Sequence, residues 1–156
     1  MNTVTLSVKP CLAKYLYARY QNFVENGVIK LPARCLLYHN LLQLTAPRPK
    51  DVSWLEKGNL TLALPRPEKG KDPRTYNYLS AESVHFIEKK INMQMHMEFY
   101  EFLLEEKFKN GIPFKRSMYQ FIDTYHLEDI NEDALIKSFQ LWRKKEKEER
   151  VILKHV

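Results

Sequence analysis

The stretch from Ser80 to Lys109 constrains the fold of this chain more than any other part of the sequence. Apolar residues recur there at steps of three and four, which is the spacing of one helix face. Ser80 is a residue type that favours the N-cap of a helix, and Asn110-Gly111 ends the run. Further apolar residues, Met93 and Met97 among them, fall outside the main stripe. We therefore expect a long helix that is buried on two sides or lies in a subunit interface.

Two shorter helices are predicted after this long one. Pro113 opens a helix with one apolar face that ends near Tyr125, and Asn131 is a good N-cap for the last helix. The acidic residues Glu132 and Asp133 follow in its first turn, where the helix dipole favours them. In element order, these three helices resemble a trihelical helix-turn-helix module. An ordinary packed helical hairpin with a solvated charged face is the alternative.

The N-terminal part of the chain shows the patterns of short strands and helices in alternation. Strands are predicted at residues 3–8, 28–31 and 60–64, where apolar residues alternate or form short runs. Helices are predicted from Pro10 to about Tyr20 and from Pro32 until Pro47 stops the second one. The predicted fold class is α+β, with a small three-stranded sheet and two helices followed by a three-helix, helix-turn-helix-like half.

The excess of basic over acidic residues lies in the first half of the chain. Residues 1–78 hold 12 Lys and Arg against 5 Asp and Glu, whereas residues 79–156 hold 13 against 14. The formal net charge of +6 therefore belongs to the first half. We expect a basic α+β half at residues 1–78 and a helical half with a charged C-terminal tail at residues 79–156. Clustered cations raise the local concentration of anionic partners, so this surplus favours a polyanion as the partner.

Two Pro-rich basic segments of the first half are the candidate phosphate contacts, because phosphates need cations and bases can stack on aromatic rings. Tyr76 and Tyr78 follow one segment, and Trp54 follows the other. The alternative is that both segments are plain exposed loops and that the two tyrosines pack beneath the long helix. The contacts predicted in this half are Arg48, Lys50, Arg66, Lys69, Lys71 and Arg74.

The last helix supplies a second set of candidate contacts. Lys137, Gln140 and Lys144 lie at helical spacing opposite its apolar face, and Lys115 and Arg116 on the preceding helix would touch the nucleic-acid backbone. Recognition helices usually present their first turn to the bases. Here that turn carries two acidic residues, which repel phosphates.

Motifs for catalysis, cofactors or metals are weak in this sequence. Gly70-Lys71 does not match a phosphate-binding loop. Pro65 stands where that loop needs a Gly, and Asp72 stands where it needs Ser or Thr. His85 and His96 do not have a recognised metal-ligand spacing. The two cysteines match no zinc pattern and are expected to be reduced structural thiols. We therefore predict no cofactor, no metal site and no enzymatic activity.

Together these observations favour a non-enzymatic nucleic-acid-binding protein with a regulatory or accessory role. DNA is expected rather than RNA, and a cytoplasmic location is expected because no secretion signal or apolar membrane-spanning run is evident. The main alternative is a protein-interaction module that forms a homodimer through the helix at residues 80–109 and has no affinity for nucleic acid. A third class is a hydrolase or nuclease whose acidic and histidine residues converge only in three dimensions.

Overall fold

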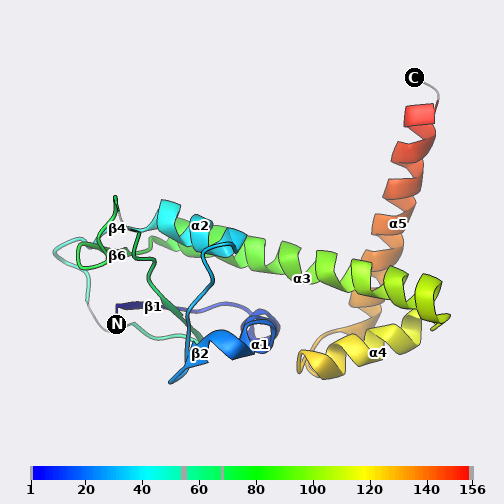
Figure 1. The fold of residues 1–156 in the computed structure, drawn as a ribbon, viewed down its shortest axis with the longest axis horizontal. Coiled ribbons are helices and arrows are strands. Elements are labelled where there is room, and N and C mark those ends of the chain that lie inside the picture. The colour runs from blue at the N-terminus through cyan, green and yellow to red at the C-terminus, as the bar shows by residue number, and fades with distance from the viewer. Residues whose placement is uncertain (1, 54–55, 68, 155–156) are drawn as a thin grey trace. The chain divides into compact units, whose positions relative to one another are not determined.

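The computed structural model describes residues 2–53, 56–67 and 69–154 and contains both helices and strands (Figure 1). The predicted α+β class is confirmed. The chain forms two compact units, Met1–His96 and Met97–Val156. The border between them falls inside the long helix α3 (Ala81–Asn110), whereas the sequence division at residues 78 and 79 was drawn from charge. Trp54, considered above as a stacking residue, lies outside the described residues.

Unit 1 is built around a four-stranded sheet with the order β1-β5-β3-β2. The strands β1 (Thr3–Leu6), β3 (Val28–Ile29) and β5 (Leu60–Ala63) confirm the three strands predicted from the sequence. β1 pairs with β5 antiparallel, while β3 runs parallel to β5. The alternating pattern of β1 and β5 places every second side chain in the core, which is why both were visible in the sequence.

The fourth strand, β2 (Val24–Glu25), joins the sheet through a tight hairpin with β3. Asn26 and Gly27 form the two-residue turn, with φ angles of 52° and 77°. Two consecutive positive φ angles are the requirement of a type I′ turn, which Asn-Gly satisfies better than most residue pairs. The Asn26-Gly27 turn thus sets the register of the β2–β3 hairpin.

Two helices accompany the sheet of unit 1. α1 (Pro10–Arg19) begins at Pro10 as predicted, and its Tyr15 and Leu16 are fully buried. α2 (Leu36–Leu44) begins four residues later than predicted. The amide of Cys35 donates to the carbonyl of Pro32 at 2.9 Å, so residues 32–35 form a turn before the helix starts.

A second, two-stranded sheet was not predicted. β4 (Ala46–Pro47) pairs antiparallel with β6 (Tyr76–Tyr78) in the two segments that the sequence indicated as loops. The register shifts between Ala46 and Pro47. Strands of two and three residues are too short to show an alternating pattern, so the β4–β6 sheet could not be predicted from the sequence. A short 3₁₀ turn, η1 (Gln21–Phe23), follows α1.

The long helix α3 agrees closely with its prediction. The Oγ of Ser80 accepts the amide of Ser83 at 3.1 Å, which is an N-cap, and Gly111 follows the helix with a φ of 66°. Within unit 1, Ile87, Ile91 and Met95 of α3 are buried in the core.

Unit 2 packs three helical segments around an aromatic core. α4 (Phe114–Thr124) and α5 (Glu132–Lys154) accompany the second part of α3, and both were predicted. Asn131 Oδ1 accepts the amide of Ala134 at 3.0 Å and caps α5. The Phe99 ring lies 5.2 Å from that of Phe121 and 6.3 Å from that of Phe139. These rings are fully buried, and aromatic pairs of this geometry stabilise a core beyond their area alone.

Candidate nucleic-acid interface

Unit 2 contains a groove of about 630 Å³ between α4 and α5, called here the α4–α5 groove. Its apolar lining comes from Phe114 and Met118 of α4 and from Ile136 and Phe139 of α5. Met118 and Phe139 are almost completely buried, so they form the floor. The charged lining residues therefore surround an apolar base, which lowers the local dielectric constant and strengthens their interaction with a ligand charge.

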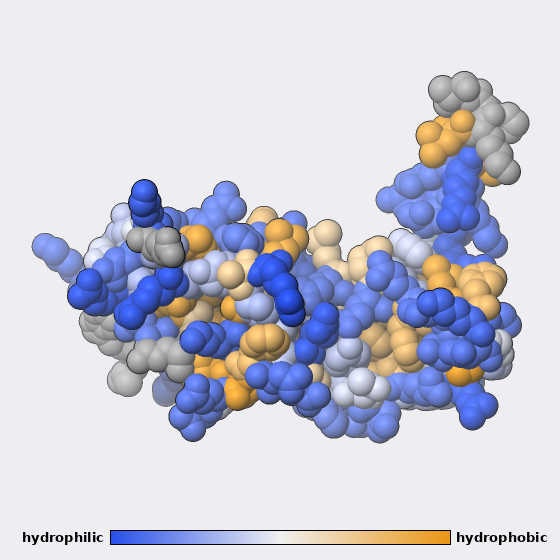
Figure 2. Space-filling model, viewed as in Figure 1, coloured by the Kyte–Doolittle hydropathy of each residue, from blue (hydrophilic) through white to orange (hydrophobic). Residues whose placement is uncertain are grey.

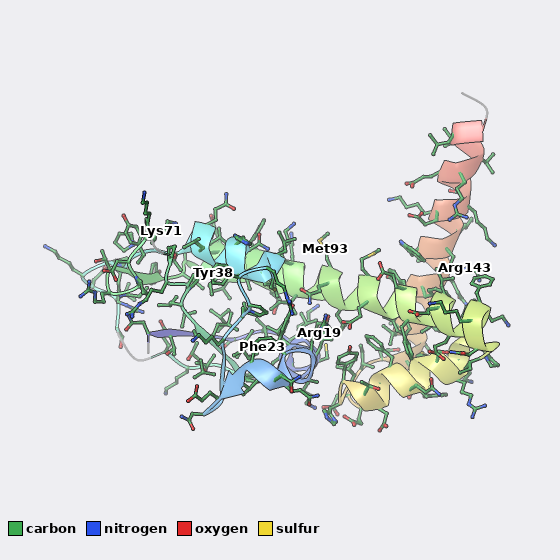
Figure 3. All side chains as sticks on the ribbon, in the orientation of Figure 1. Arg19, Phe23, Tyr38, Lys71, Met93 and Arg143 are labelled. Carbon is green, nitrogen blue, oxygen red and sulfur yellow. The ribbon has the colours of Figure 1, made fainter. Side chains whose placement is uncertain are left out.

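One end of the α4–α5 groove is cationic. The guanidinium carbon of Arg143 lies 5.0 Å from the centre of the Phe114 ring and 5.8 Å from that of Phe139 (Figure 3 labels Arg143). The Nζ of Lys107 lies 5.8 Å from the centre of the same Phe114 ring. Cations at these distances from aromatic rings are held in position by the ring electrons without losing their charge. We call the set Lys115, Arg143, Lys144 and Lys147 the basic end of the groove.

The basic end carries no acidic partner within the part of the chain that the structure describes. The ion pairs among the described residues join Arg48 to Glu56, Arg74 to Asp72 and Lys109 to Glu105. None of these six residues lines the α4–α5 groove. Unpaired cations on a helix keep their full attraction for an anion, because no internal carboxylate has to be displaced first.

The other end of the α4–α5 groove is acidic. Glu132 and Asp133 line it, and they occupy the first turn of α5. Arg143 lies eleven positions after Glu132, which places the two ends about 16 Å apart along the helix axis. The groove therefore has a charge gradient along α5, and a polyanion is favoured at one end and opposed at the other.

The structure brings together some, though not all, of the residues predicted in this half. Lys115, Gln140 and Lys144 line the α4–α5 groove, whereas Arg116 and Lys137 are exposed outside it. Arg143 and Lys147 were missed by the sequence analysis. A signal for them was present, because both share the helical spacing of i, i+3, i+4 and i+7 with Gln140 and Lys144.

Arg48, the first of the contacts predicted in residues 1–78, is bonded inside the protein. Its side chain is 8% exposed, and its guanidinium donates to the Glu56 carboxylate at 2.7 Å and to the carbonyls of Ser53 at 2.9 Å and Asn77 at 3.1 Å. A buried pair of this kind is costly to break. We therefore leave Arg48 out of the proposed contact set.

Lys71 is also engaged inside the protein. Its Nζ donates to the carbonyls of Leu42 at 3.0 Å, Gln43 at 2.8 Å and Thr45 at 2.8 Å, at the C-terminal end of α2 (Figure 3). The last carbonyls of a helix have no partner within the helix, and a cation there also matches the helix dipole. Lys71 acts as a C-cap of α2, and we leave it out of the contact set as well.

Arg74 is exposed but pairs with a neighbour. Its guanidinium donates to Asp72 at 2.8 Å, and its own amide donates to the same carboxylate at 2.9 Å. These hydrogen bonds, with the Arg74 charge, lower the pKa of Asp72 to about 2. The pair is solvent-exposed, so Arg74 can exchange this partner for a phosphate at small cost.

The remaining predicted cations of the first half, Lys50, Arg66 and Lys69, are exposed.

The two tyrosines predicted to stack on bases are instead approached by cations of the protein itself. Lys71 Nζ lies 5.7 Å from the centre of the Tyr76 ring, and the Arg48 guanidinium carbon lies 5.7 Å from that of Tyr78. Both rings are half-buried, which makes them poor platforms for an incoming base.

The Cys35 thiol and the Tyr20 phenol belong to one buried polar cluster. The hydroxyl of Tyr20 lies 3.1 Å from the Cys35 sulfur, and Gln94 donates to that hydroxyl at 3.1 Å. Burial and the hydrogen bond with Cys35 raise the pKa of Tyr20 to about 12. Burial also raises the pKa of Cys11. Since the thiolate is the reactive form, this environment disfavours Cys11 as a nucleophile.

Over residues 2–53, 56–67 and 69–154, no group of three or more His, Cys, Asp and Glu is placed to hold a metal ion. Within the same residues, every helix falls short of the length and apolar character that crossing a bilayer would require.

The chain was also compared with known proteins. No family model, no curated protein and no solved structure matches it.

Proposed function

We propose that this protein binds nucleic acid, with DNA preferred, through the basic end of the α4–α5 groove, and that it serves as a non-enzymatic regulatory or accessory factor. The observation that carries the proposal is the grouping of Lys115, Arg143, Lys144 and Lys147 with no acidic partner among the described residues. Phosphate contacts of this kind supply most of the affinity of non-specific nucleic-acid binding.

The shape of α5 supports duplex DNA as the ligand. An α-helix with its side chains is about 10–12 Å across, and the major groove of B-form DNA is about 12 Å wide. The second half of α5 carries mostly charged residues, and Figure 2 shows that its surface is hydrophilic over most of its length. Because Glu132 and Asp133 oppose phosphates, the contacts are proposed for the later turns of α5, not for its first turn.

Fluorescence anisotropy with a labelled DNA duplex, measured across a salt series, tests the proposal. Lys144→Gln removes one cation of the basic end, and Lys145→Gln removes an exposed cation from the same helix outside the groove. We expect Lys144→Gln to weaken binding and to reduce the slope of log K against log salt by about 0.9, because one phosphate contact is lost.

The Lys145→Gln control should leave both the affinity and the slope close to those of the parent protein. Equal effects of the two substitutions would show that DNA binding depends on the total charge of the protein and not on the residues of the basic end. Lack of duplex binding by the parent protein at low salt would overturn the proposal.

A homodimer formed through α3 is the second candidate function. Phe86, Met93 and Met97 of this helix are 42%, 57% and 41% exposed, and their spacing of seven and four residues is that of a helix–helix contact. Flexible methionines adapt readily to a partner surface. Sedimentation velocity at rising protein concentration should then show a dimer, and Met93→Glu should convert it to a monomer. A parent protein that stays monomeric would exclude this candidate.

A further inference from the structure

Unit 1 contains a second groove, of about 690 Å³, at the end of its sheet where β3 and β5 stop. We call it the β3–β5 groove. Its walls include Leu31 and Pro32, which follow β3, and Leu64 and Pro65, which follow β5. Proline has a fixed φ angle, so walls of this composition lose little conformational freedom when a ligand enters.

Two aromatic side chains from different elements line the β3–β5 groove. Phe23, at the end of η1, is 39% exposed, and Tyr38 comes from α2 (Figure 3 labels both). The Phe23 ring contacts Tyr20 edge-on, with the ring centres 6.5 Å apart. Unlike Tyr76 and Tyr78, neither ring is approached by a cation of the described residues.

Two exposed cations, Lys30 and Arg66, complete the lining. Lys30 directly follows β3 and Arg66 lies three residues after β5, so they stand on the two segments that form the walls. Neither takes part in an ion pair within residues 2–53, 56–67 and 69–154. The amide side chain of Asn2, which can both donate and accept hydrogen bonds, also lines this groove.

We infer that the β3–β5 groove binds a nucleotide of single-stranded nucleic acid, with the base against Phe23 and the phosphate beside Lys30 or Arg66. A nucleotide combines a flat apolar group with an anion, which is the combination that this lining complements. Base–aromatic stacking tolerates any base, because every base has a π-face. This inference rests on the proposed nucleic-acid function and adds a second contact that needs an unpaired strand.

Anisotropy with a labelled oligothymidylate tests the inference, since this strand forms no hairpin. The variants are Phe23→Ala and Arg66→Gln, with Leu36→Ala and Lys57→Gln as matched controls that are exposed in unit 1 but outside the groove. We expect each groove variant to weaken oligothymidylate binding about fivefold or more, and each control to change it less than twofold. Duplex binding by the same variants should match the parent protein.

A polyglutamate peptide of equal charge separates stacking from simple attraction of an anion. We expect Phe23→Ala to weaken oligothymidylate binding but not polyglutamate binding. If oligothymidylate binding is unchanged in both groove variants, the inference is overturned while duplex binding still supports the proposed function. If Phe23→Ala weakens both ligands equally, the groove is a general anion or peptide site and the nucleotide assignment is wrong.

A direct readout does not depend on affinity differences. In Phe23→Trp, addition of oligothymidylate should quench the tryptophan fluorescence beyond the change seen in the parent protein, because a base stacks on the indole ring. Quenching no larger than in the parent protein would contradict stacking at Phe23, even if the strand binds elsewhere.

Discussion

At the scale of single residues, the basic side chains of this protein divide into internal and external roles. Arg48 and Lys71 satisfy carbonyl and carboxylate oxygens of the fold, whereas Lys144 and Arg143 line an open groove. Their formal charges are the same. The difference lies in the geometry of oxygen atoms around each cation, and it decides which lysines and arginines can meet a phosphate.

Removal of the Lys71 charge should destabilise the fold. In Lys71→Met, three carbonyl oxygens at the end of α2 lose a charged donor, and we expect the free energy of unfolding to fall by about 2–3 kcal/mol. Urea denaturation followed by circular dichroism measures this change. The matched substitution Lys69→Met, at an exposed position, should change the free energy of unfolding by less than about 0.5 kcal/mol. Equal losses in both variants would contradict the capping role.

At the scale of elements, the helices were predicted better than the strands. The caps at Ser80 and Asn131 and the proline at Pro10 are local signals, because the residues that make a cap lie within one turn of each other. The pairing of β4 with β6 joins Ala46 to Tyr78 across a long stretch of sequence. Such a pair depends on the path of the intervening chain, which no local pattern describes.

The end of α4 offers a test at this scale. His126 follows the helix with a φ of 58°, and the amide of Leu127 donates to the carbonyl of Ile122 at 2.9 Å, as in a Schellman motif. A left-handed conformation is costly for residues with a Cβ atom. We therefore expect His126→Gly to raise the free energy of unfolding by about 0.5–1 kcal/mol in urea denaturation.

The control for this prediction is Gln120→Gly, at an exposed position in the interior of α4. It should lower the free energy of unfolding by about 0.5–1 kcal/mol, since glycine is unfavourable in a helix interior. If His126→Gly also lowers the stability, the imidazole makes a contribution that the backbone geometry does not explain.

At the scale of the whole molecule, the charge surplus of the first half does not by itself locate a binding surface. Arg48 and Lys71 are used internally and Arg74 pairs with Asp72, which reduces the cations free to attract a polyanion. Meanwhile the second half, nearly neutral in its formal charge, gathers cations at one end of the α4–α5 groove and acids at the other. Net charge over a long segment is therefore a weak guide to the local field.

A comparison of paired substitutions tests which half contributes more to duplex binding. We expect Lys144→Gln with Lys147→Gln to reduce the salt slope of duplex DNA binding by about 2, because two phosphate contacts are lost. Arg66→Gln with Lys69→Gln, which removes the same charge from the first half, should reduce it by less than 1. The reverse order would move the duplex interface to the first half of the chain.

The sequence by itself indicated the helices apart from the start of α2, the caps at Ser80 and Asn131, a turn at Asn26-Gly27 and the strands β1, β3 and β5, because each depends on residues that are close neighbours along the chain. Only the tertiary structure decided that Lys71 caps α2, that Phe23 and Arg66 share a groove, and that Arg143 lies against Phe114. Those contacts join segments distant in sequence. Their distances follow from how the whole chain packs, and hydrophobic packing is non-directional, so a local pattern cannot encode them.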